Sequence, residues 1–173
     1  MPLVFGTHVT AAFTRCTRLV PTSSIVVAQS DLTMKKGDRA KLTYTVLPDN
    51  TSDNLKFASD NERVVKVDKK GKVTAVGTGN AVVTILAESG VSTTVNVNVV
   101  ALNKTVLNMR QYDTETLIVQ GTSSPITWYS ENQRVASVEN GKVVGKSIGS
   151  TNIYAYVNGC KLTCRVTITS VNS

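Results

Sequence analysis

The side chains that most often perform catalysis are few and scattered in this chain of 173 residues. Its single histidine is His8, so it cannot supply a His-based catalytic triad or a histidine-rich metal site. The carboxylates Asp49, Asp53, Asp60 and Glu62 lie close together, but in Asn- and Asp-rich segments where such side chains usually bond to nearby backbone. We therefore expect no enzyme activity, no cofactor and no metal ion.

The three cysteines cannot all form disulfides with one another. Cys160 and Cys164 lie four residues apart in an alternating segment, which on an extended strand puts them on one face about 13 Å apart. This separation exceeds the limit of roughly 7 Å for a disulfide. We predict that both are buried and act as small apolar residues.

The most informative aromatic residues lie in the last third of the chain. Trp128 and Tyr129 are adjacent, so they point to opposite faces of a strand, and we assign Trp128 to the core. Tyr129, with Tyr154 and Tyr156, could form an exposed patch suited to sugar stacking or to a protein contact. The alternative is that these tyrosines only cover the edge of the core.

An internal repeat organises the elements around these residues. Residues 71–85 and 141–154 each contain a glycine turn, a short alternating strand, a second glycine turn and another alternating strand, which is typical of a tight β-meander. In the alignment of the two copies, Phe57 falls on Trp128 and Gly71 on Gly141. The same register puts the two cysteines at core positions.

The predicted fold class is all-β: two tandem Ig-like β-sandwiches preceded by a short N-terminal arm. Aromatic residues make up only 5% of the chain, and valine and threonine are abundant, which favours strands. Seven strands are expected in the first repeat, and residues 40–46 read as one of them. We assign residues 1–24 to an arm or linker, 25–101 to the first domain and 102–173 to the second.

The join between the repeats is short. Residues 99–104 contain neither glycine nor proline, so the last strand of the first unit is expected to continue almost directly into the second. This predicts a stiff rod with limited hinging. No apolar run is long enough for a membrane span.

The N-terminal segment differs from the rest. Residues 1–24 contain no acidic residue, match neither repeat and resemble an export signal only loosely, so secretion of the chain as written is not expected. We predict an arm that becomes ordered on a partner; the alternative is an extra strand folded back on the first domain. The predicted docking residues are Leu3, Val4, Phe5, Phe13, Arg15 and Arg18.

Charge excludes one class of partner. The formal net charge is +7, but the 19 basic and 12 acidic residues are spread along the chain. A nucleic-acid-binding surface would need a basic stripe with interleaved aromatic residues, and none is present. We expect no nucleic-acid partner.

These motifs together resemble a known family. A Lys36-Gly37-Asp38 turn, Phe57 or Trp128 followed two residues later by serine, Arg-Val segments at 63–67 and 134–138, and Gly-Lys-Val with a downstream glycine are similar to the bacterial Ig-like domain, group 2. The resemblance covers both repeats. It implies a rigid module displayed outside the cell or on a virus particle, without catalytic residues.

The resemblance leaves two functional hypotheses. The first is a bacteriophage structural protein, a capsid decoration or tail-associated protein present in multiple copies and assembled in the host cytoplasm. Residues 1–24 would dock on capsid or tail proteins, and the domains would adhere weakly to host cell-surface glycans. The absence of an export signal and an anchor favours it. The alternative is a bacterial cell-surface adhesin or carbohydrate-binding module that uses the tyrosine side.

Overall fold

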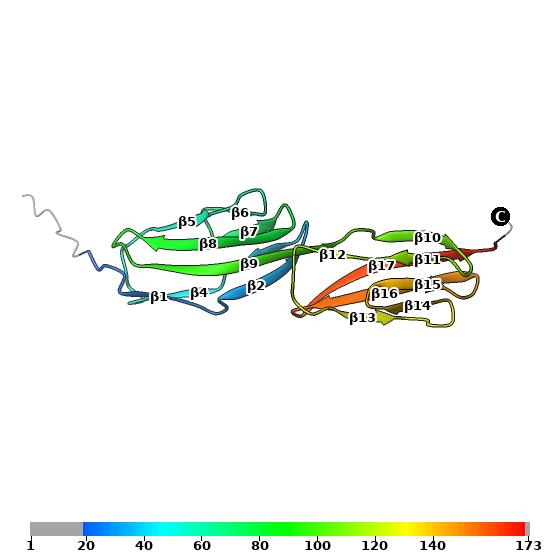
Figure 1. Cartoon of the computed structure of the whole chain (residues 1–173). Coiled ribbons are helices and arrows are strands. Elements are labelled where there is room, and N and C mark those ends of the chain that lie inside the picture. Colours follow the sequence, from blue (N-terminus) through cyan, green and yellow to red (C-terminus); the bar gives the residue numbers. More distant parts are fainter. Residues whose placement is uncertain (1–18, 172–173) are drawn as a thin grey trace, which may run out of the picture.

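The computed structural model describes residues 19–171, and this part of the chain consists of strands and connecting turns. Figure 1 shows two sandwiches arranged end to end, each built from one half of the sequence. The predicted all-β class and the tandem arrangement are confirmed. No helix of the described chain has the length and apolar character needed to cross a membrane. The predicted docking residues between Leu3 and Arg18 lie outside the described residues.

The first domain contains nine strands, the last of which extends beyond it. They are β1 (Ser24–Val27), β2 (Asp31–Lys35), β3 (Arg39–Lys41), β4 (Tyr44–Leu47), β5 (Leu55–Ser59), β6 (Val65–Val67), β7 (Lys72–Ala75), β8 (Gly79–Ala87) and β9 (Ser92–Leu102).

The second domain repeats this order. Its strands are β10 (Val106–Arg110), β11 (Thr114–Thr116), β12 (Val119–Gln120), β13 (Thr127–Ser130), β14 (Ala136–Glu139), β15 (Lys142–Gly145), β16 (Gly149–Val157) and β17 (Cys160–Thr169).

Each domain packs a large sheet against a smaller one. In the first domain, the large sheet contains β5, β8, β9 and β2, and the small sheet contains β3, β7 and β6. In the second domain, the large sheet contains β13, β16, β17 and β10, and the small sheet contains β11, β15 and β14. In each large sheet, the strand that comes first in the sequence pairs in parallel with the one that comes last: β2 with β9, and β10 with β17. The other strand pairs of these sheets are antiparallel. Alternate residues of the long strands, such as Val83 and Ile153, are fully buried between the sheets.

The predicted strand over residues 40–46 is in fact two strands. β3 pairs with β7, whereas β4 pairs with β1, so the chain leaves one sheet and joins another between them. Leu42 lies in this break; its side chain is buried, and its backbone N–H donates to the Gly71 carbonyl at 2.9 Å. Alternation continues through the break, which is why the sequence did not reveal it.

The repeated glycines support the aromatic residue of each core. Gly71 and Gly141 both have positive φ, at 74° and 83°. A Cβ on Gly71 would lie 3.0 Å from the Phe57 ring, and one on Gly141 would lie 3.2 Å from the Trp128 ring and 2.4 Å from the Leu117 carbonyl oxygen. Glycine is therefore required both by conformation and by space. Trp128 packs against the core of its domain while remaining partly accessible.

Strand β9 belongs to both domains. Val99 is fully buried in the first core and Val100 is fully buried in the second, because consecutive residues of a strand face opposite sides. The end of β9 then pairs with β12, matching Leu102 to Val119, just as β1 pairs with β4 in the first domain. The second sandwich therefore uses the end of β9 as its first strand.

Candidate functional site

The three tyrosines lie on the outer face of the large sheet of the second domain. Tyr129 on β13 is directly opposite Tyr154 on β16, and Tyr156 follows two residues later on the same face. On β16 they alternate with Ile153, Ala155 and Val157, which are buried. The tyrosines thus stand on the solvent side of the sheet and do not cover the edge of the core.

The rings form a contiguous row. The Tyr129 and Tyr154 rings are nearly parallel, with centroids 6.1 Å apart and an interplanar angle of 7°. Tyr154 and Tyr156 have centroids 6.5 Å apart and are tilted by 56°. Tyr129 is 52% exposed and Tyr156 38% exposed, whereas Tyr154 between them is half-buried. The row therefore presents two accessible rings, Tyr129 and Tyr156, on either side of the less accessible Tyr154 ring.

A lysine completes the group and was not predicted from the sequence. The Lys161 ammonium nitrogen lies 3.8 Å from the Tyr154 ring centroid and 5.8 Å from that of Tyr156, within cation–π range. Its position follows from the turn at Asn158 and Gly159, both with positive φ, which pairs Tyr156 with Lys161. An Asn-Gly pair between alternating segments is a hairpin signal, so this register could have been found in the sequence. We call Tyr129, Tyr154, Tyr156 and Lys161 the tyrosine face.

The first domain carries different side chains at the same positions. Matching strand registers place Ala58, Thr84, Leu86 and Ser92 where the second domain has the tyrosine face. We call these four residues the counterpart face. The two domains share the backbone arrangement, but only the second presents aromatic rings with a cation over them; the cation of the first, Lys56, lies opposite Leu86.

Two of the four clustered carboxylates, Asp53 and Asp60, act as structural acceptors. Asp53 accepts backbone N–H bonds from Thr22 at 2.8 Å and from Ser89 at 3.2 Å. Hydrogen bonding from Ser89, followed by that from Thr22, lowers the pKa of the Asp53 carboxyl. Asp60 Oδ1 accepts from the Val82 N–H at 2.7 Å. No group of three or more potential metal ligands occurs within residues 19–171.

Residues 20–23, which belong to the segment assigned to the arm or linker, are held by the loop after β4 and by the end of β4 itself. The Ser52 N–H donates to the Val20 carbonyl at 2.9 Å, and the Ser23 N–H donates to the Leu47 carbonyl at 2.7 Å. Thr22 is only 4% exposed. These residues therefore belong to the first domain, whose loop and strand form hydrogen bonds with their backbone groups.

The two cysteines of the last strand form no disulfide. Cys164 is buried in the core and Cys160 is partly buried. Desolvation raises the pKa of both thiols, so both remain protonated near neutral pH. The prediction of a buried, small apolar residue is confirmed for Cys164, whereas Cys160 is only partly buried at the margin of the core.

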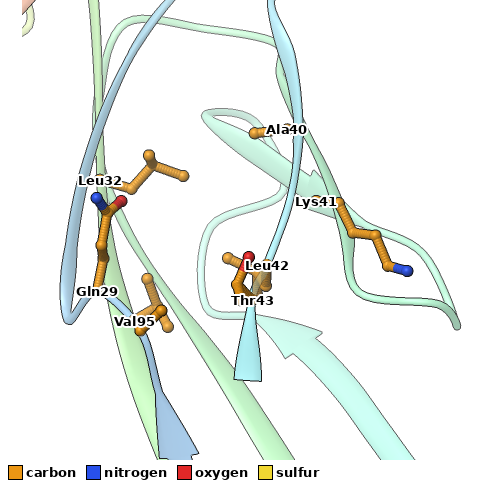
Figure 2. Close-up of a pocket in the computed structure, with 8 residues that line it drawn as sticks. Gln29, Leu32, Ala40, Lys41, Leu42, Thr43 and Val95 are labelled. Atoms are coloured by element: carbon orange, nitrogen blue, oxygen red, sulfur yellow. The ribbon is translucent and has the colours of Figure 1, made fainter. Parts of the chain in front are cut away.

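The hollow shown in Figure 2 offers little chemistry. It has a volume of about 290 Å³ and lies at the break between β3 and β4. Leu32 and Val95 line it, together with Gln29 and Thr43, and Lys41 points away from Leu32 and Val95. The lining contains no carboxylate, thiol or imidazole. The tyrosine face is the stronger candidate for a ligand.

Comparison with known families identifies the modules. The model of the bacterial Ig-like domain (group 2) matches residues 21–99 and 96–168. The chain belongs to this family. The two matched stretches overlap at residues 96–99, within β9, which is the strand shared by the two Ig-like domains.

Curated relatives of these Ig-like domains include enzymes that act on carbohydrates. A lacto-N-biosidase of Bifidobacterium bifidum is 47% identical over 73 residues, covering 42% of this chain and 7% of the enzyme. An alpha-L-arabinofuranosidase of Bifidobacterium longum is 30% identical over 151 residues, covering 78% of this chain and 14% of the enzyme. The chain thus spans only a small part of the curated relatives it matches.

Solved structures similar over most of the chain include a fragment of intimin. It is the C-terminal 282-residue fragment of intimin in complex with the intimin-binding domain of the translocated intimin receptor. The match has a TM-score of 0.51 and 22% identity, and covers 87% of this chain and 65% of the intimin chain. At this identity the likeness shows the fold alone.

Proposed function

We propose that this chain is a rigid, non-catalytic Ig-like module of a bacterial cell-surface or secreted protein that adheres to, or acts on, carbohydrates. It holds the outer face of its second domain at a fixed distance and orientation from the first. The observation that carries the proposal is the burial of Val99 and Val100 in two different cores. A strand held on both faces cannot bend without exposing one of these side chains.

Further contacts hold the junction. Asn98 on β9 donates through Nδ2 to the carbonyl of Gly121 at 2.7 Å. Gly121 follows β12 with φ at +87°, and an added Cβ would lie only 2.1 Å from the Val99 carbonyl oxygen and 2.8 Å from the Gly79 nitrogen. The loop between β12 and β13 thus rests directly on the first domain, where only glycine fits.

The relatives support the bacterial setting. Two of them are named as glycosidases, and a third, 31% identical over 130 residues, as a polysaccharide lyase 8 family protein of Enterococcus faecalis. A spacer that positions a domain relative to a glycan suits such proteins. The virion role expected from the sequence has no support among these matches, so we favour the cell-surface or secreted setting.

Rigidity can be tested by measuring distances between the domains. Lys66 and Lys142, one exposed residue in each domain, are changed to cysteine and spin-labelled. The native cysteines must be removed first, because their thiols could also react with the label. Cys160 and Cys164 are then changed to valine, the residue at the equivalent Val91 and Val95, and Cys16 to serine. We expect a single narrow distance distribution.

A glycine substitution provides the matched perturbation. Gly121→Ala should broaden or shift the distribution, because the new Cβ displaces the turn from β9. Gly90→Ala is the control, since Gly90 also has positive φ but no atom within 4 Å of an added Cβ, and lies away from the junction. A broad distribution in the unsubstituted junction would overturn the proposed rigid module.

A further inference from the structure

We infer that the tyrosine face binds a glycan that carries carboxylate groups, with Tyr129 and Tyr156 stacking on sugar rings and Lys161 pairing with the acid. This inference rests on the proposed setting among carbohydrates and names the ligand class. It assigns Lys161 a role in specificity.

The fold itself does not require the tyrosines. The first domain closes the same sheet with the counterpart face, which contains alanine, threonine, leucine and serine. Because both domains have fully buried cores, the aromatic residues of the second domain are extra to the folding pattern. An aromatic row on one of two similar faces is the signature of a contact made by that face.

The geometry separates the roles of the three rings. Strand β16 lies between β13 and β17, so Tyr129 and Lys161 approach the Tyr154 ring from opposite sides. Both faces of the Tyr154 ring are therefore occupied, and this residue acts as a positioning residue. Tyr129 and Tyr156 retain accessible ring surface for a ligand.

The charge at this face favours an anion. Within residues 19–171 the ion pair formed is that of Lys104 with Glu115, and Lys161 has no carboxylate partner. Arg165, also exposed, lies two alternating positions further along β17 on the same face. At the position of Arg165 the first domain has Asn96, whose Nδ2 donates to the Asp31 carboxylate at 2.9 Å. In the second domain Asn152, opposite Arg165, donates through Nδ2 to the Glu131 carboxylate at 2.7 Å, so the cation without an acidic neighbour in this row is Lys161.

The surroundings favour a sugar over a protein. Thr127 is paired with Tyr156, and Thr163 with Tyr154, so exposed hydroxyl groups flank the rings on both sides. Sugar sites combine aromatic surface with a few polar groups, whereas a stable protein interface needs about 800 Å² per partner with an apolar centre. Three rings between two threonines fit the smaller ligand.

The experiment is an NMR titration of the full chain. Two acidic probes are used, a glucuronate-containing hexasaccharide and a sialylated oligosaccharide, each beside its carboxyl-reduced neutral counterpart. We expect chemical-shift changes for the acidic probes on β13, β16 and β17, with no change on the counterpart face. Affinity should fall as salt is raised, because an exposed cation is screened.

Substitutions assign the roles. Lys161→Gln should weaken binding of the acidic probes about fivefold and leave the neutral probes unaffected, and Tyr129→Ala should weaken both kinds about tenfold. Lys56→Gln, which removes one positive charge from the outer sheet of the first domain, is the matched control and should change nothing. Amide spectra of each variant verify that both domains remain folded.

Three results would overturn the inference. The first is the absence of chemical-shift changes at the tyrosine face with either acidic probe at about 10 mM. The second is an equal loss of affinity for the acidic probes in Lys161→Gln and in Lys56→Gln. The third is equal affinity for the acidic and the neutral probes. Saturation by an acidic peptide with no response to any glycan would identify a protein contact instead. The distance measurement uses no ligand, so failure of this inference and failure of the rigid module are separate outcomes.

Discussion

The outer faces of the two large sheets show how one backbone pattern can carry two surfaces. The register of β8 on β9 is reproduced by β16 on β17, and the buried residues alternate in the same way. The outward residues between them are unrelated: the tyrosine face is aromatic and cationic, whereas the counterpart face consists of alanine, threonine, leucine and serine, with Lys56 opposite Leu86. The inward residues are constrained by the core, whereas the outward ones are free to differ between the two domains.

The largest effect is expected from the shared core positions. Ile153 and Val83 are equivalent and both fully buried. Ile153→Ala should destabilise the second domain by about 2–5 kcal/mol through lost burial and a cavity, and Val83→Ala the first domain by a smaller amount, since valine has less side chain to lose. Urea denaturation followed by NMR would assign each loss to its domain. If Ile153→Ala unfolds both domains together, β9 couples them into one cooperative unit.

A smaller effect is expected when the tyrosine face is converted to its counterpart. The substitutions Tyr129→Ala, Tyr154→Thr, Tyr156→Leu and Lys161→Ser should lower the unfolding free energy by about 1–2 kcal/mol, from lost cross-strand and cation–π contacts. The second domain should remain folded, with binding of the acidic glycan probes abolished. Denaturation and NMR titration would measure the two effects.

The reciprocal graft is the control for that conversion. Placing three tyrosines and a lysine on the counterpart face should create a second site and raise the binding stoichiometry from one to two. Collapse of the second domain after the first exchange would instead mean that its tyrosines are structural.

The smallest effect concerns acid stability. The pKa of Asp53 is lowered in the folded protein, so its contribution to stability is present above the unfolded pKa near 3.8 and is lost as pH falls through the lower folded value. The corresponding turn of the second domain, residues 121–125, contains no carboxylate. Asp53→Asn should therefore reduce the acid sensitivity of the first domain, while Asp49→Asn, in the same loop, should not. Urea midpoints between pH 5 and pH 2 would measure this, and an equal response to both substitutions would contradict it.

The prediction of the fold succeeded because hydrophobic alternation and glycine turns are local signals. Phe57 and Trp128 could be matched, and each lies beside the glycine that makes room for it. The break between β3 and β4 was missed because Leu42 faces the core in either arrangement. The partners of residues 20–23 could not be named from the sequence, because Ser52 and Asp53 lie about 30 residues away in a loop.

The candidate site was only partly accessible to prediction. The alternation of Tyr154 and Tyr156 placed them on one face, but the opposite position of Tyr129 depends on strand pairing. Lys161 was overlooked although the Asn158-Gly159 turn fixes its register. The adhesive role of the three tyrosines remains a prediction.

By itself, the sequence determined which side chains face inward and where the chain turns, because both depend on residues that are neighbours along a strand. The tertiary structure decided which strands lie side by side, and so brought Tyr129 and Lys161 to opposite sides of Tyr154. It also decided that Val99 and Val100 enter different cores, since only the folded domains show what each face of β9 meets. Contacts between distant segments have no local signature, and they create both the rigid junction and the proposed glycan site.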